Sequence, residues 1–223
     1  MEQKKRIVAL VPLRGGSKSI PYKNIKDIAG KPLAYWTLKA ACEAKDIDAV
    51  YVSTEDQKIK DVVLSLGLDV KVVDRPHEFA EDTSSTESVM LHFAEVVDFD
   101  MLLTLQATSP LTTSADIDAA FGRMLSEGYD SLLTGVLTKR FYWTLDGIPL
   151  NYNYLHRPRR QDFPGTVVEN GAFYITKRSI LLENKNRLGG KIGIYHTPED
   201  TYVEIDEPTD WSIVEKLLLD RQH

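Results

Sequence analysis

Short apolar runs alternate with amphipathic segments along the first part of the chain, and this alternation predicts the fold. Five runs have the length and the β-branched content of buried strands, at 7–12, 49–53, 69–73, 101–105 and 131–136. Segments with helical periodicity separate them, at 33–44, 55–66, 87–97 and 115–126. Because strands that alternate with helices form parallel sheets covered on both faces, we expect an α/β fold with a doubly wound, mostly parallel sheet. In such sheets the ligand lies at the carboxyl ends of the strands.

Two short polar patterns predict where helices begin. Thr54 with Gln57 forms a capping-box pattern before the helix at 55–66. Ser84 with Glu87 repeats this pattern before the helix at 87–97. We therefore expect Thr54 and Ser84 to cap these helices.

The regular pattern breaks after the fifth strand. Residues 137–168 combine aromatic residues and prolines with the basic cluster HRPRR at 156–160, and they show no helical period. The stretch is too long for a simple connection. We expect an arm at about 138–168, inserted in a single domain of residues 1–223, that packs against a second copy in a homodimer or homotetramer. Beyond the arm we expect strands at 171–176, 192–196 and 202–205, and helices at 177–183 and from Pro208 onward.

Composition and charge narrow the classes of function. The 223 residues are 43% hydrophobic and 27% charged, which is ordinary for a globular chain with a sizeable core. The formal net charge of −6 argues against a general nucleic-acid binder. Residues 13–31 nevertheless hold five cations and a single acid, which indicates a small anionic substrate. The single cysteine, Cys42, allows no internal disulfide, and no stretch has the pattern of a signal peptide or a membrane span, so we expect a cytoplasmic protein without a membrane partner.

The loop after the first strand, LRGGSKSIPYKN at 13–24, carries the clearest candidate chemistry. Gly15 and Gly16 allow a tight turn that brings backbone N–H groups close to a ligand. Arg14, Lys18 and Lys23 add positive charge, and the loop contains no acid. Such a loop suits a polyphosphate, although a solvated surface turn has a similar composition. It matches neither the G-x-G-x-x-G pattern of dinucleotide binders nor a Walker A loop, whose second glycine is missing here.

Further stretches extend this loop into an ordered set of motifs. They are VPLRGGSKSIPYKNIKDIAGKPL (11–33), VSTED (52–56), RPHEFAEDTSS (75–85), LLTLQATSPL (102–111), RRQD (159–162) followed by ENGAFYITKR (169–178), and EID (204–206). In this order the motifs resemble those of the acylneuraminate cytidylyltransferases, also called CMP-sialic acid synthetases, of the CMP-Neu5Ac and CMP-KDN type. The resemblance spans nearly the whole chain and implies a Rossmann-like nucleotidyltransferase fold.

The resemblance also implies a reaction. The anomeric hydroxyl of a nonulosonic acid, either Neu5Ac or its deaminated relative KDN, attacks the α-phosphate of CTP, and pyrophosphate leaves. Such a transfer depends mostly on positioning and on neutralising charge. The implied catalytic residues are Arg14, Lys18, Lys23 and Asp206. The implied CTP-binding residues are Arg14, Gly16, Ser17, Lys18, Lys23, Asn24, Arg75 and Thr86. From its local sequence alone, Arg75 is an ordinary surface arginine.

The same resemblance implies a pocket for the sugar acid. Its residues are Gln106, Arg160, Gln161, Asn170, Gly171 and Tyr174. The planar fork of Arg160 suits the substrate carboxylate, which it would reach across a dimer interface. Local sequence leaves other roles open, because Gln106 is also a plausible loop amide, Arg160 part of a solvated cluster and Tyr174 a core residue.

Two acidic residues near the end of the chain are the implied metal ligands. Glu204 and Asp206 stand two residues apart on the expected strand at 202–205 and its end, so they should project to the same face. Two carboxylates together with phosphate oxygens and water suit Mg²⁺, with Mn²⁺ as a possible substitute. The family usually has aspartate at both positions, so Asp206 is the stronger candidate.

Three alternatives stay open at this point. A cytidylyltransferase for the eight-carbon acid KDO would be expected to carry Leu-Gly-Ser in place of the Gly-Gly-Ser at 15–17. A legionaminic or pseudaminic acid cytidylyltransferase differs only in its sugar. A catalytically impaired nucleotide-binding relative is suggested by Glu204 and by Thr112, which stands where an arginine is common in the family.

Overall fold

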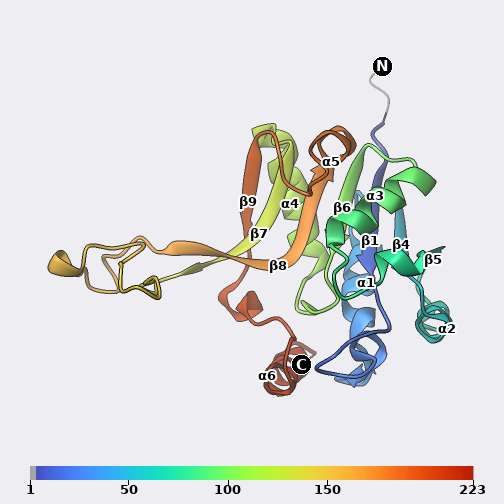
Figure 1. Cartoon of the computed structure of the whole chain (residues 1–223), viewed down its shortest axis with the longest axis horizontal. Helices are drawn as coiled ribbons and strands as arrows, with labels where there is room; N and C mark the ends of the chain where they lie inside the picture. Colours follow the sequence, from blue (N-terminus) through green and yellow to red (C-terminus); the bar gives the residue numbers. More distant parts are fainter. Residues whose placement is uncertain (1–3, 223) are drawn as a thin grey trace.

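The computed structural model describes residues 4–222; residues 1–3 and 223, which the sequence assigns to the same domain, lie outside the described part. Its main sheet has the strand order β5-β4-β1-β6-β8-β7-β9 (Figure 1). The strands are β1 (Ile7–Pro12), β4 (Ala49–Thr54), β5 (Val70–Asp74), β6 (Met101–Leu105), β7 (Ser131–Thr138), β8 (Thr166–Lys177) and β9 (Ile192–His196). Only β8 runs antiparallel to its neighbours in this sheet. The expected α/β fold with a mostly parallel sheet is therefore confirmed.

Helices cover both faces of this sheet, because alternate strand residues pack to opposite sides. Ala9 and Val11 of β1 belong to a core shared with α1 (Leu33–Glu43), α2 (Gln57–Ser65) and α4 (Ser114–Glu127). Val8 and Leu10 pack toward α3 (Thr86–Val96) and α5 (Arg178–Asn184). This is the doubly wound arrangement that the sequence predicts. Among residues 4–222, no helix combines the length and the apolar character that crossing a membrane requires.

A third cluster of buried residues joins the two ends of the chain. Trp211, Val214 and Leu218 of α6 (Pro208–Asp220) pack against Ile20 and Ile28 of the segment that follows β1. That segment contains a 3₁₀ helix, Lys23–Ile25, and a small hairpin of β2 (Asp27–Ile28) and β3 (Lys31–Pro32). The last helix thus packs against the segment that follows β1, at the bottom of the view in Figure 1.

Strand β8 differs from the expected short strand at 171–176. It begins at Thr166, and its first part pairs with the end of β7, where Thr138 lies opposite Thr166. The chain therefore leaves along β7 and returns along β8 in a long antiparallel ribbon. This return path inserts β8 between β6 and β7, an arrangement that local periodicity does not reveal.

The residues between β7 and β8 project away from the body of the molecule (Figure 1). Aromatic rings stabilise this arm, since the Phe141 and Tyr152 rings stack at 4.2 Å and the Arg157 guanidinium lies 4.6 Å from the centre of the Phe141 ring. Leu145 and Leu155 are fully or largely exposed. The arm lies between β7 and β8, and its role in pairing two copies stays a prediction.

Three local expectations are wrong. Residues 202–205 form no strand. Tyr202 is the last residue of a 3₁₀ helix, Glu199–Tyr202, and within residues 4–222 the residues that follow it pair with no strand. Asp56 rather than Thr54 caps α2, accepting the backbone N–H of Ile59. Ser85 caps α3, while the hydroxyl of Ser84 donates to the carbonyl of Glu78.

Candidate active site

Two adjoining cavities lie at the carboxyl ends of the parallel strands, where the loops after β1, β5 and β6 converge. The first cavity holds about 440 Å³ and is lined by residues of four chain regions: Pro12, Arg14, Ser17, Lys18, Ser19, Lys23, Asn24, Arg75, Phe79, Glu81, Asp82, Ser84, Ser85, Thr86, Val89, Gln106, Thr108 and Asp206. The second holds about 390 Å³ and is lined by Thr86, Gln106, Thr108, Glu169, Gly171, Tyr174, Arg187 and Glu204. Thr86, Gln106 and Thr108 line both, so the two cavities are adjacent.

Close approach of Asp56, in the turn between β4 and α2, explains why glycine occupies position 15. A Cβ atom there would meet Oδ2 of Asp56 at 2.5 Å, and Asp56 is fixed because it caps α2. The Gly15 N–H donates to Oε1 of Glu55 at 2.8 Å, and the Ser17 N–H donates to the Gly15 carbonyl at 3.0 Å. These two amides are already satisfied, so the loop's side chains carry its positive charge toward the first cavity.

Arg14 and Lys18 both form ion pairs with the carboxylate of Asp82 in the first cavity. The distance from Nη1 of Arg14 to Oδ1 of Asp82 is 3.0 Å, and the distance from Nζ of Lys18 to Oδ2 is 2.6 Å. The hydrogen bond from Lys18, aided by the charge of Arg14, lowers the pKa of Asp82. The two cations are thus arranged around a pair of anionic oxygens, which is the geometry that a phosphate group requires.

Arg75 is buried, with 6% of its surface exposed, so its assignment as a surface arginine is wrong. Its guanidinium donates to the carbonyls of Leu13 and Ser53 and to the hydroxyl of Ser53. Burial lowers the pKa of Arg75, against the opposing charge of Glu55, whose Oε2 lies 3.9 Å away. The side chain ties the ends of β1, β4 and β5 together at the edge of the first cavity.

Lys23 links the first loop to the acidic segment near the end of the chain. Its Nζ donates to the Ile205 carbonyl at 2.7 Å and lies 3.5 Å from Oδ1 of Asp206, with 12% of the side chain exposed. The Ser19 hydroxyl donates to the Asp206 carbonyl at 2.5 Å. Ile205 is fully buried in the cluster under α6. Hydrogen bonds from Ser19 and Lys23, together with the burial of Ile205, therefore hold residues 204–206 against the cationic loop.

The two expected metal ligands lie on either side of Ile205 and face different cavities. Glu204 lines the second cavity and Asp206 the first. Burial, followed by repulsion from Asp206, raises the pKa of Glu204, and a bound cation would relieve this repulsion. Within residues 4–222, no three or more His, Cys, Asp or Glu side chains gather as a metal site. The pair still suits Mg²⁺, which commonly takes one or two carboxylates and completes its shell with phosphate oxygens and water.

The remaining CTP residues from the sequence separate into two groups. Ser17, Asn24 and Thr86 line the first cavity, and the Asn24 amide donates to the Arg14 carbonyl at 3.0 Å. Gly16 is exposed in the same loop and is not among the residues that line this cavity. The structure thus brings together all of the expected CTP residues except Gly16.

The expected sugar residues are more dispersed. Gln106, Gly171 and Tyr174 line the second cavity. Asn170 is buried beside it, and its amide donates to the hydroxyl of Thr197 and the carbonyl of Thr201, at 3.0 and 3.1 Å. Asn170 therefore anchors the chain that leads to Glu204 and does not line the second cavity. The other two residues, Arg160 and Gln161, are exposed on the arm and line neither cavity.

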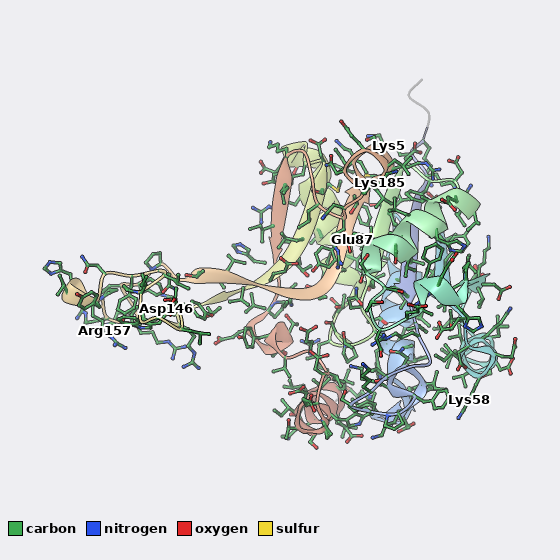
Figure 2. The ribbon with its side chains drawn as sticks, in the orientation of Figure 1. Lys5, Lys58, Glu87, Asp146, Arg157 and Lys185 are labelled. Atoms are coloured by element: carbon green, nitrogen blue, oxygen red, sulfur yellow. The ribbon has the colours of Figure 1, made fainter. Side chains whose placement is uncertain are left out.

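Arg187 is the functional candidate that the sequence does not indicate. It lines the second cavity and pairs with Glu87, which stands 100 residues earlier in the chain. Figure 2 labels Glu87 on α3 and Lys185 at the end of α5, where the connection that carries Arg187 begins. No local pattern around residue 187 signals this pairing. Thr112 is also explained here, because it is buried and its hydroxyl donates to the Ser109 carbonyl within the turn, outside both cavities.

Comparison with known proteins shows the family to which the chain is similar. A family model described as Cytidylyltransferase matches residues 8–222. The N-acylneuraminate cytidylyltransferase of Oncorhynchus mykiss is 36% identical over 97% of this chain and 51% of that protein, so the chain spans about half the length of this relative. The CMP-N,N'-diacetyllegionaminic acid synthase of Legionella pneumophila is 29% identical, over 96% of each chain. A solved structure of CMP:2-keto-3-deoxy-manno-octonic acid synthetase complexed with CTP has the same fold, with a TM-score of 0.73 and 18% identity over 97% of this chain and 99% of that one.

Proposed function

Because the chain belongs to the cytidylyltransferase family, we propose that it transfers CMP from CTP to the anomeric hydroxyl of a nonulosonic acid, either Neu5Ac or KDN. The adjacency of a cationic cavity and a polar one carries this proposal. A triphosphate and a sugar acid need two adjoining sites of these two kinds. The relative from Oncorhynchus mykiss, an N-acylneuraminate cytidylyltransferase, supports the choice of sugar.

The proposed reaction forms one bond and breaks one. The anomeric oxygen of the sugar attacks the α-phosphorus of CTP and loses its proton to water, while the bond from this phosphorus to the bridging oxygen breaks and pyrophosphate leaves with the electron pair. Arg14, Lys18 and Lys23 bind the phosphate oxygens and stabilise the charge that grows on the leaving pyrophosphate. When bound, Mg²⁺ or Mn²⁺ supplies further positive charge to the phosphates, and Glu204 and Asp206 would hold it.

Asp82 occupies the anion position of the first cavity, so removing its charge should help CTP to bind. We expect Asp82→Asn to lower the KM for CTP by up to about fivefold, the range that an exposed ion pair of about 1 kcal/mol allows. The effect should shrink at high salt. Steady-state titration of CTP at two salt concentrations measures this change. Asp74→Asn is the matched control, since Asp74 pairs with Lys60 at 2.7 Å outside both cavities. A higher KM for CTP in Asp82→Asn would show that Asp82 assists binding instead.

The arm enters the proposal through a second copy of the chain. In one copy Arg160 and Gln161 are exposed on the arm, which projects away from the body of the molecule (Figure 1), and they do not line the second cavity. A role in binding the sugar acid therefore requires the arm of a partner. We propose that two copies exchange arms, either in a homodimer or in a homotetramer that consists of two such dimers. The exposed apolar residues of the arm, including Leu145 and Leu155, support this pairing.

Arg160→Ala should therefore affect the sugar rather than the nucleotide. Loss of a charge-assisted hydrogen-bond pair to the substrate carboxylate predicts a rise of about tenfold to a hundredfold in the KM for the sugar acid. The KM for CTP should not change, and sedimentation should still show the oligomer. Arg140→Ala, an exposed arginine at the start of the arm, is the control. A defect confined to CTP would contradict this role for Arg160.

Pyrophosphate release tests the proposed function. The purified chain is incubated with Mg²⁺, with CTP or UTP, and with Neu5Ac, KDN, legionaminic acid or KDO. The proposal predicts release only with CTP and a nine-carbon acid. A preference for legionaminic acid would favour the second candidate, which the relative from Legionella pneumophila supports. Release with KDO alone would favour the KDO enzyme. CTP binding without turnover of any keto-sugar acid would reject the enzyme and favour an impaired nucleotide-binding relative.

A further inference from the structure

The second cavity is lined almost entirely by polar side chains. Every lining residue except Gly171 carries a hydrogen-bonding side chain, and no aliphatic side chain of leucine, valine or isoleucine type is among them. The one aromatic ring, that of Tyr174, has the guanidinium of Arg187 over it, 4.7 Å from the ring centre. The cavity therefore offers a hydrogen-bonding surface in place of an apolar one.

Arg187 is fixed in this position by three contacts. Its Nε and Nη2 donate to the two carboxylate oxygens of Glu87 at 2.5 and 3.0 Å, in a forked pair whose side chains are only 20% and 18% exposed. Its backbone carbonyl accepts the Thr176 hydroxyl at 2.7 Å. Tyr174, beneath the guanidinium, donates its hydroxyl to Glu169. The lining is thus held rigid before any substrate arrives.

The charges of this cavity decide what part of a sugar acid it accepts. Glu87 balances Arg187, and the other charged lining residues, Glu169 and Glu204, are both acids. A substrate carboxylate placed here would be repelled, and it belongs toward the cations of the first cavity or the arm. Hydroxyl groups both donate and accept hydrogen bonds, so they can satisfy the carboxylates and the unused N–H groups of Arg187 together.

Resting on the proposed function, we propose that this cavity, with Arg187 as its specificity residue, selects a nonulosonic acid whose substituents are hydroxyl groups over one that carries an N-acyl group. The methyl group of an acyl substituent would cover charged groups here without giving them a hydrogen bond, and leaving such groups unpaired weakens binding. The favoured substrate is therefore the deaminated acid, KDN, and the disfavoured one is Neu5Ac.

The test compares kcat/KM for KDN and Neu5Ac, at saturating CTP, in the unchanged chain and in Arg187→Leu. The unchanged chain should favour KDN at least tenfold. Arg187→Leu should raise the KM for KDN, leave the KM for CTP unchanged and narrow the ratio at least tenfold. Arg178→Met is the control, since Arg178 lies 4.9 Å from the centre of the Phe99 ring and outside both cavities. This variant should keep the original ratio.

Arg187→Lys keeps the positive charge but not the planar fork, and it should also narrow the ratio if the leucine variant fails to fold. Equal or better use of Neu5Ac by the unchanged chain would overturn the inference, and so would an unaltered ratio in a folded Arg187 variant. Neither result would contradict the proposed function, because CMP transfer to a nonulosonic acid would still occur. The absence of transfer to every nonulosonic acid would instead reject the proposed function and this inference with it.

Discussion

Lys23→Met is expected to lower kcat/KM for CTP by about 10² to 10³-fold, the usual loss when a preorganised donor to a developing anion is removed. Lys23 is the most buried of the three cations assigned to the phosphates, and its amino group is fixed by the Ile205 carbonyl at 2.7 Å. A fixed charge costs no reorganisation when pyrophosphate begins to leave. The variant should retain most of its affinity for CTP, because Arg14 and Lys18 remain.

Lys26→Met is the matched control for this substitution. Lys26 lies three residues further along the same segment, and its ammonium group packs over the ring of Trp211 at 4.6 Å, away from the first cavity. Steady-state rates with CTP and the sugar acid, together with thermal unfolding of both variants, separate a catalytic defect from a folding defect. If Lys23→Met kept full activity, the assignment of Lys23 to the leaving pyrophosphate would be wrong.

Asp206→Asn is expected to abolish turnover that depends on Mg²⁺, with a loss of at least about 10²-fold, while the fold stays intact. The side chain of Asp206 is exposed to the first cavity, and it is the backbone carbonyl that bonds to Ser19, so the amide variant keeps the structural contact. The charge that would hold the metal is lost, together with the ion pair to Lys23. Activity measured across a Mg²⁺ titration, with unfolding as the check on structure, tests this expectation.

Asp200→Asn serves as the control, since Asp200 pairs with Arg221 at 2.7 Å outside both cavities. Unchanged activity in Asp206→Asn would show that the metal assignment is wrong. Because Asp206 lies 3.5 Å from Nζ of Lys23, the double variant should lose less than the product of the two single losses. Full multiplicative loss would mean that the two residues act independently.

The parts of the fold that depend on local sequence could be predicted. Apolar runs between helical segments identified β1, β4, β5, β6 and the helices between them, and the glycine-rich loop marked the carboxyl end of β1. Strand direction could not be read in the same way. Since β8 returns from the arm beside β7, its antiparallel place in the sheet depends on the arm rather than on its own residues.

The site shows the same division. Arg14, Lys18 and Lys23 could be found because they stand together in one loop, and Asp206 because the family resemblance covers its motif. The local sequence of Arg75 indicates a surface residue, since its partners are Leu13, which follows β1, and Ser53 of β4, and only the folded sheet brings them near. Arg187 is not indicated by its local sequence for the same reason, because its position depends on Glu87 of α3.

Alternation of residue types wrongly predicts a strand at the acidic segment. Glu204, Ile205 and Asp206 have the acidic-apolar-acidic pattern of a strand, but a strand requires a neighbour to form a ladder. Here the Ile205 N–H instead donates to the carbonyl of Thr108 at 2.9 Å, in a loop rather than a strand. The pattern still identified the buried residue and the two acids beside the cavities, although the element itself was wrong.

Phosphorus NMR of the reaction mixture tests the central claim most directly. The purified chain, CTP, Mg²⁺ and KDN are combined, and the fate of each phosphate is followed over time. The proposed transfer predicts that the CTP signals are replaced by one phosphodiester signal from the CMP-sugar and one pyrophosphate signal of twice its area, since pyrophosphate has two equivalent phosphorus atoms. This change should occur only when the sugar acid is present. Conversion of CTP to CMP without the sugar product, or unchanged CTP with KDN and Neu5Ac alike, would contradict the account.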